Sequence, residues 1–482
     1  EIETTPNSHI YFQYEYYAFE MDAGNSFFDE NQLYVNFINC IPALVGRENE
    51  AIQITLDIPS NYKIACGLEE IEEHLLVADN YAELIDSPMF ASSSLQEKTY
   101  AIGNTMFHIW VQGKYEADWN KIINDFKKFS IENIHLFGDF PYSDYHFLIQ
   151  ILPYRYYHGV EHRNSTVIIL GKDQENPIDF YDDLLGISCH ELFHTWNVCK
   201  IRPKEMMPYD YTKENYFETG FIAEGVTTYY GDYLLARSNV FTTEQYFKEI
   251  NTLLKRHFHN YGRFNASLAE SSFDLWLDGY QQGIPNRKVS IYVKGALIAL
   301  LLDLMIRKET NNEKSLDDIM RVMWLQLGKN KKGYTIEHYK NYIMQIFDST
   351  FAKKYIQDYV YGTVPLENVL SEALNYVGCE LTITPNSILH ERLGFKMIKQ
   401  KIYQIDPNST ASTLLSIKDE IIDFDEKENL CEITIKRNCE EKIIILPIDS
   451  SANFYPIHQI SKKSTATHEE KENFKCWLNQ LF

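Results

Sequence analysis

The sequence has no long uncharged hydrophobic stretch, no internal repeat and no low-complexity tract. Its longest apolar run, from Gly295 to Leu302, is far shorter than the ~18 residues that cross a bilayer as a helix. Positive charge is also in short supply, because 45 Lys and Arg stand against 68 Asp and Glu and give a net charge of −23. That imbalance disfavours nucleic acids and anionic membranes, so we expect neither as a partner.

Cysteines are sparse: there are eight in 482 residues, and no Cys-x-x-Cys pair occurs. This number is too low for a disulfide-stabilised scaffold. We expect thiols in a reducing compartment, and hence a cytoplasmic protein. The chain begins at Glu1 without a methionine. We therefore also expect upstream residues, and a periplasmic location if they held a targeting signal that has been removed.

Hydrophobic residues make up 45% of the chain and aromatic residues 14%, which favours well-filled cores over disorder. The length predicts two to four domains. Alternating β-type patterns dominate up to about residue 113, helical patterns run from 179 to about 376, and strand patterns return after 378. We therefore predict an α+β multidomain protein, with a β domain over 1–113, a mostly helical domain over 114–377 and a β domain with a final helix over 378–482.

Several elements are predicted individually from these patterns. An early strand is expected over 10–17 and a long helix over 179–198. The run Ser165 to Leu170 is expected to be a strand. A last helix is expected over 468–481.

The most informative motif is His-Glu-Leu-Phe-His, which spans residues 190–194. Histidines four residues apart lie on the same face of a helix, so His190 and His194 can bind one metal ion. The intervening Glu191 then sits where it can take a proton from a water at the open position. The alternative is a buried helix whose two histidines are satisfied by hydrogen bonds.

A third ligand is offered by Glu224, the only acidic residue between Gly220 and Gly231. A carboxylate in such an apolar run is costly to bury unless it meets a cation. With the two histidines it completes a tetrahedral zinc site that keeps one position open, so we predict one zinc ion. The alternative is a glutamate that pairs with an arginine or lies exposed at a helix end.

These motifs, in this order and at this spacing, resemble the glycyl aminopeptidase family of gluzincin metallopeptidases, distant relatives of aminopeptidase N. The resemblance spans most of the chain, and rests on the sequences around the two metal-binding motifs together with 81–88, 159–167, Ile201-Arg-Pro203 and Tyr292-Val-Lys-Gly295. It implies a thermolysin-like catalytic domain and a PDZ-like C-terminal domain. It also implies an aminopeptidase that prefers small N-terminal residues, Gly or Ala.

The resemblance assigns roles to three further residues. Tyr292 is expected to donate a hydrogen bond to the oxyanion; the alternative is one of 34 tyrosines in the core. The resemblance also implies that the strand Ser165 to Leu170 is an edge strand beside a cleft, to which an extended substrate pairs. Gly159 is expected to allow close backbone approach of that substrate. Glu161 is expected to face the α-ammonium group of a peptide with a free N-terminus; the alternative is a glutamate paired with His162 or Arg163.

The C-terminal region contains Leu393-Gly394-Phe395, which looks like the carboxylate-binding loop of a PDZ domain. Lys418 stands where such domains usually have glycine. The fold is therefore predicted to be PDZ-like, and the sequence leaves open whether this module binds a peptide.

Two other functions compete with the aminopeptidase prediction. One is a catalytically inactive peptidase-like protein that recruits partners through the PDZ-like module. The other is a zinc hydrolase of non-peptide amides or epoxides with the same residues. The intact His-Glu-His set and Glu224 argue against the first, and only a substrate panel separates the second.

Overall fold

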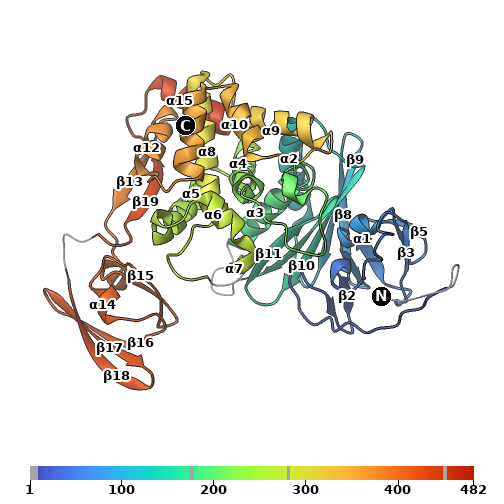
Figure 1. Cartoon of the computed structure of the whole chain (residues 1–482), viewed down its shortest axis with the longest axis horizontal. Coiled ribbons are helices and arrows are strands. Elements are labelled where there is room, and N and C mark those ends of the chain that lie inside the picture. Colours follow the sequence, from blue (N-terminus) through green and yellow to red (C-terminus); the bar gives the residue numbers. More distant parts are fainter. Residues whose placement is uncertain (1–8, 173–178, 279–282, 449–452) are drawn as a thin grey trace. The chain divides into compact units, whose positions relative to one another are not determined.

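The structure is a computed structural model that describes residues 9–172, 179–278, 283–448 and 453–482 (Figure 1). The chain forms two compact units. Unit 1 comprises Glu1–Ile123 and Tyr142–Glu191, and unit 2 comprises Asn124–Pro141 and Leu192–Phe482. The division falls inside two continuous helices, α2 (Trp119–Phe137) and α3 (Asp179–Phe193). None of the helices in the described part of the chain has the length and apolar content to span a membrane.

Unit 1 is built from three sheets. The first two are small antiparallel sheets, in the orders β1-β2-β7-β4 and β3-β6-β5, that enclose a core with the short helix α1 (Tyr81–Ile85). Their strands are β1 (Phe27–Phe28), β2 (Gln32–Val35), β3 (Ile52–Thr55), β4 (Lys63–Cys66), β5 (Glu69–Glu72), β6 (Leu75–Ala78) and β7 (Met89–Ser92).

The third sheet has five strands in the order β11-β12-β10-β9-β8. These are β8 (Gln96–Ile102), β9 (Thr105–Gln112), β10 (Asp144–Leu152), β11 (Tyr156–Glu161) and β12 (Ser165–Gly171). β10 pairs in parallel with both β9 and β12, and β11 closes one edge antiparallel to β12. Every residue of β12 is buried, as expected for a strand covered on both faces.

This topology corrects the prediction that Ser165 to Leu170 is an edge strand. That run is β12, which lies between two partners, and the edge is β11, which contains both Gly159 and Glu161. A continuous apolar run marks an interior strand, whereas the polar pattern of β11 is that of an exposed border. The strand predicted over 10–17 is also wrong, because those residues are irregular and mostly exposed.

Unit 2 is mainly helical, and its centre is the apolar helix α8 (Ile291–Glu309), which is buried over most of its length. Around it lie α4 (Thr227–Arg237), α5 (Thr243–Phe258), α6 (Leu268–Phe273), α9 (Leu316–Met323), α10 (Ile336–Met344), α12 (Glu367–Tyr376), α15 (His468–Leu478) and the π-helical segment η3 (Phe221–Val226) (Figure 1). Shorter helical segments are η2 (Lys204–Met206), η4 (Tyr261–Phe264), α7 (Leu275–Asp278), η5 (Trp324–Gly328), α11 (Ser349–Tyr355) and η6 (Ile356–Val360).

The C-terminal part of unit 2 contains a five-stranded antiparallel sheet in the order β14-β15-β16-β17-β18. Its elements are α13 (Leu389–Arg392), β14 (Phe395–Ile398), β15 (Lys401–Ile405), α14 (Ala411–Leu414), β16 (Glu420–Glu426), β17 (Leu430–Arg437) and β18 (Glu440–Pro447). The sheet has its own core, centred on residues such as Phe395, Ile421 and Ile433. It is inserted between β13 (Cys379–Thr384) and β19 (Ile457–Lys462), which pair with each other.

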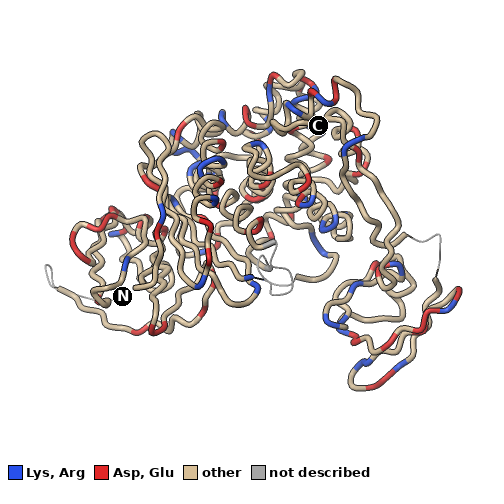
Figure 2. Tube along the Cα trace, turned by 180° about the vertical axis from the view of Figure 1, so that it is seen from behind, with Lys and Arg blue, Asp and Glu red and all other residues tan. Residues whose placement is uncertain are grey.

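Figure 2 shows Asp and Glu spread along the tube in both units rather than gathered on one element. The α+β multidomain prediction is confirmed in its coarse form, as β sheets in unit 1 and a helical unit 2. The PDZ-like character of the C-terminal sheet and the boundaries 1–113, 114–377 and 378–482 stay predictions.

Candidate metal centre

The helix α3 carries the first part of the site, and its end is set by aromatic packing. Helix α3 ends at Phe193, earlier than the predicted 198, and a tight turn follows in which the amide of Asn197 donates to the carbonyl of Phe193 at 3.1 Å. The ring of Phe193 stacks on Tyr230 at 4.6 Å. Trp196 is fully buried and donates its indole N–H to the carbonyl of Asp139 at 3.2 Å. The turn is therefore held rigidly directly after the second histidine.

This turn orients the imidazole of His194. Its Nδ1 lies 2.8 Å from the carbonyl oxygen of Asn197, which can only accept, so Nδ1 carries the proton. The opposite nitrogen, Nε2, then presents a lone pair. A backbone acceptor behind a ligand histidine fixes its tautomer and ring orientation in this way. His194 is 1% exposed, so the geometry is sheltered from competing water.

Glu224 lies in η3, a π-helical segment. Such segments interrupt the normal backbone hydrogen bonding of a helix and often mark functional sites. Here the side-chain amide of Asn197 satisfies the displaced carbonyls, donating to those of Ile222 at 2.8 Å and Ala223 at 3.2 Å. The same Nδ2 lies 2.9 Å from Oγ1 of Thr227. One asparagine thus positions both the His194 ring and the backbone that carries Glu224.

Helix α8 supports η3 from the other side through a contact between two glycines. A Cβ added to Gly225 would lie 2.5 Å from Cα of Gly295 and 2.7 Å from the carbonyl oxygen of Ile291. Only glycine permits this backbone approach. Tyr292 lies on the same first turn of α8 and is half-buried. The Tyr292-Val-Lys-Gly295 motif therefore packs its glycine against the segment that bears Glu224.

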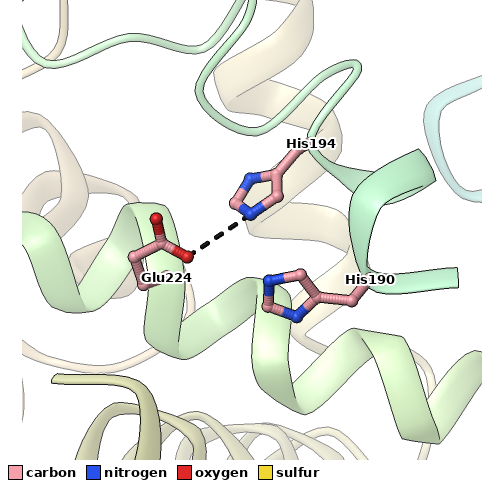
Figure 3. A group of neighbouring side chains, drawn as sticks. All are labelled: His190, His194 and Glu224. Atoms are coloured by element: carbon pink, nitrogen blue, oxygen red, sulfur yellow. Dashed lines mark ion pairs between the residues drawn. The ribbon is translucent and has the colours of Figure 1, made fainter. Parts of the chain in front are cut away.

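Figure 3 shows His190, His194 and Glu224 with their side chains directed toward one another. The ligand atoms of the three residues all lie within 4.8 Å of one another, and Nε2 of His194 is 3.3 Å from Oε2 of Glu224. Ligands about 2.0–2.1 Å from a tetrahedral ion lie about 3.3 Å apart. Two imidazole nitrogens and one carboxylate oxygen at this spacing fit a zinc ion.

A second group contains the predicted base and the predicted recognition residue. Carboxylate oxygens of Glu161 and Glu191 and a ring nitrogen of His194 also lie within 4.8 Å of one another. Glu161 ends the edge strand β11, and Glu191 follows His190 on α3. A Cβ added to Gly159 would lie 2.4 Å from Oε1 of Glu191. A larger residue at Gly159 would therefore displace the carboxylate of Glu191 from its place beside β11.

Two family models match parts of the chain. The family model of the M61 glycyl aminopeptidases matches residues 183–298, which include the three candidate ligands, and the family model of the peptidase M61 N-terminal domain matches residues 1–93. In both segments the chain is therefore similar to the M61 glycyl aminopeptidases. It is a metallopeptidase, a hydrolase. None of the curated proteins compared with the chain matches it.

Among solved structures, an aminopeptidase N family protein from Idiomarina loihiensis is similar over 96% of this chain and 85% of its own, with a TM-score of 0.85 and 26% sequence identity. An M1 zinc metallopeptidase from Deinococcus radiodurans has a TM-score of 0.43 at 13% identity, over 71% of this chain and 72% of its own. Yeast LTA4 hydrolase has a TM-score of 0.44 at 12% identity, over 69% of this chain and 51% of its own. Those last two likenesses are too remote to carry an argument.

The structure brings together six of the seven residues predicted from the sequence, and it places Tyr292 in the α8 turn that packs on η3. Asn197 was not predicted. Its signal in the sequence is an asparagine three residues after a ligand histidine. In the structure this asparagine directly precedes Val198, whose backbone φ is 100°. An asparagine buried beside such a turn commonly bonds to nearby backbone.

Proposed function

We propose that this metallopeptidase is a zinc aminopeptidase that binds one zinc ion through His190, His194 and Glu224. It removes the N-terminal residue of peptides and prefers small residues, Gly or Ala. The observation that carries the proposal is the pairing of a three-ligand set with two further carboxylates, Glu191 and Glu161, around His194. Three ligands are the number that leaves a catalytic zinc an open position.

The residues of the chain divide the chemistry between them. Zinc, when bound, supplies Lewis acidity that lowers the pKa of a water towards 7 and polarises the carbonyl. Glu191 takes the proton of the attacking water and passes it to the leaving amine. Glu191 is 5% exposed, so its carboxylate acts in a site with little competing solvent. Tyr292 donates a hydrogen bond to the carbonyl oxygen as it becomes an oxyanion.

Glu161 decides where cleavage occurs. As the last residue of the edge strand β11, it lies where an extended peptide that pairs with β11 would begin. Its carboxylate pairs with the α-ammonium group, and a blocked N-terminus would leave that carboxylate unpaired in a sheltered site. Gly159 keeps this strand clear of side-chain bulk, so the substrate backbone can approach.

The test compares free and N-acetylated Gly- and Ala-amide substrates. Wild type should cleave the free forms and fail on the acetylated ones, and Glu161→Ala should lose ~10²-fold or more in kcat/KM on the free forms while zinc content stays at about one per chain. Elemental analysis after dialysis against zinc checks the metal. Equal cleavage of acetylated and free substrates would make Glu161 a structural acid and the enzyme an endopeptidase; a protein that binds no zinc would refute the whole proposal.

The inserted C-terminal sheet is proposed to be a PDZ-like domain, within the three-domain division at 113 and 377. Two backbone features support this. Gly394, in the loop before β14, has a φ of +90°, and Lys418 has a φ of 75° at the position where such domains usually have glycine. Lysine there is strained, and its amide donates to the carbonyl of Ile402 at 2.7 Å, which holds the turn in place.

A further inference from the structure

A cavity of about 520 Å³ in unit 2 is lined by basic residues from three elements. The end of α5 and the residues after it contribute Lys255, Arg256 and His259, the approach to α8 contributes Lys288, and β14 contributes Lys396. No Asp or Glu of the described chain is among the residues that line it. In a protein with a net charge of −23, four lysine and arginine side chains in the wall of one cavity need an explanation.

The walls of this cavity are joined by specific hydrogen bonds. Nε2 of Gln404 donates to the carbonyl of His259 at 2.5 Å, and Nδ2 of Asn286 donates to the carbonyl of Ile405 at 3.1 Å. Asn408 donates to the hydroxyl of Tyr261 at 2.8 Å. The inserted sheet is thus fastened to the helical part at the point where the cavity forms, so Lys396 is held at a defined place in its wall.

Lys396 lies in an unusual environment for a lysine. It is 6% exposed, and its Nζ lies 2.6 Å from Nδ1 of His259. Nε2 of His259 lies 2.9 Å from the carbonyl of Pro456, so Nε2 carries the ring proton and Nδ1 accepts from the ammonium. Burial lowers the pKa of Lys396 to about 8, although Glu391 acts in the opposite direction. Glu391 is itself buried and accepts a hydrogen bond from Asn386.

The cavity adjoins the catalytic helices. Ser290 and Val293, which flank the first turn of α8, form part of its wall. That turn packs against Gly225, the neighbour of Glu224, and it carries Tyr292. One helical turn rises only about 5.4 Å, and the start of a helix itself attracts negative charge. The first turn of α8, which carries Tyr292, therefore also forms part of the wall of the cavity.

From this arrangement we infer that the cavity is a subsite for a carboxylate of the peptide substrate, its C-terminal carboxylate in short peptides, and that Lys396 and Arg256 bind it. The inference rests on the proposed aminopeptidase function and adds a second anchor, at the opposite end of the substrate from Glu161. Glu161 would bind the α-ammonium group of the peptide, and Lys396 and Arg256 would bind its C-terminal carboxylate. The enzyme would then select short peptides whose two ends are both unblocked.

The test is a series of Gly-initiated peptides of two to five residues, each made as a free acid and as a C-terminal amide. At the best length, wild type should have a kcat/KM about 10-fold higher for the acid than for the amide, since charge-assisted hydrogen bonds discriminate at this level. Lys396→Met should reduce the ratio to about 1. Arg256→Gln, at an exposed position, should reduce it about 3-fold and covers the case in which Lys396→Met does not fold.

The matched control is Lys436→Met, an exposed lysine of the same inserted sheet that lies outside the cavity; its acid-to-amide ratio should equal that of wild type. Inorganic phosphate should inhibit cleavage of the acids more than that of the amides. A ratio near 1 in wild type at every length, or a ratio unchanged in both Lys396→Met and Arg256→Gln, would overturn the subsite. Because cleavage of the amides alone reports the aminopeptidase, failure of the subsite is distinguishable from failure of the proposed function.

Discussion

The metal centre and the basic cavity are built on opposite principles. At the metal centre, two imidazoles and the carboxylate of Glu224 converge on one point, which is an arrangement suited to a cation. In the cavity, Lys396 and Arg256 belong to a wall that has no Asp or Glu among its described residues, which is an arrangement suited to an anion. The two regions are therefore built to hold charges of opposite sign.

The two regions also differ in how firmly they are held. The metal ligands are fixed by buried hydrogen bonds through Asn197 and by a glycine contact between η3 and α8. The cavity is closed by side chains from an inserted sheet. Arg256 of α5, one of the charged residues in its wall, is exposed. Catalysis requires ligands that are held in place by buried hydrogen bonds and close packing, as at the metal centre. Binding a carboxylate requires only positively charged side chains close to it.

The largest effect should follow from removing the proton acceptor at the metal centre. Glu191→Gln keeps the size of the side chain and leaves the three ligands intact, so zinc content should remain about one per chain while kcat falls by ~10²-fold or more. Steady-state kinetics with Gly-amide substrates, together with elemental analysis, measures both. The exposed Glu214→Gln serves as a control. Turnover close to that of wild type would show that Glu191 is not the base.

A smaller effect should follow from loosening the support behind the ligands. Asn197→Ala removes the side-chain amide that donates to the carbonyls of Ile222 and Ala223, and the hydroxyl of Thr227 still donates to that of Ala223. Metal affinity should fall about 10- to 100-fold. Competition with a zinc chelator measures this. Asn133→Ala removes another fully buried asparagine, whose side-chain amide donates to the carbonyl of Phe129 in α2, and should lower stability without changing zinc affinity. Equal zinc affinity in both variants would mean that Asn197 supports the fold but not the ligands.

The smallest effect concerns Lys294, which lies on α8 between the two regions. It is 1% exposed and donates to the carbonyl of Gly362 at 3.2 Å, and burial lowers its pKa from 10.5 to about 8. Between these values the unfolded chain holds a proton that the folded chain has lost, so the free energy of unfolding should rise with pH. The gain should be about 1 kcal/mol from pH 8 to pH 9.

Denaturant unfolding across this pH range measures the effect. Lys294→Met should remove that part of the rise, while Lys308→Met, which changes an exposed lysine of the same helix, should keep it. Identical pH dependence in wild type and Lys294→Met would show that Lys294 keeps its ordinary proton affinity in the folded protein.

The metal centre could be predicted from the sequence more completely than the elements around it. A four-residue spacing on one helix predicts convergence of His190 and His194 by local geometry alone, and a lone acid in an apolar run identifies Glu224. The end of α3 at Phe193 was not predictable in this way, because it depends on the packing of Phe193 on Tyr230 and of Trp196 beside Asp139, residues that lie far away in the sequence. The order of β11 and β12 also depends on partners elsewhere in the chain.

The basic cavity was not predicted at all. Lys255, Arg256 and His259 lie at the end of α5, where basic residues ordinarily serve to stabilise the end of a helix. They form one wall of a cavity only because the fold brings Lys396, which is 137 residues beyond His259, into contact with His259. Sequence spacing carries no information about such a contact, whereas it carries almost all the information about two histidines on one helix.

The pairing of β13 with β19 sets an order of events during synthesis. The inserted sheet leaves the helical part after Thr384 and returns at Ile457, residues that face each other across the strand pair. Helix α15 follows, and its buried Trp477 accepts a hydrogen bond at its carbonyl from the hydroxyl of Tyr233 at 2.7 Å. The core of the helical part therefore stays incomplete on the ribosome until the whole inserted sheet has been made.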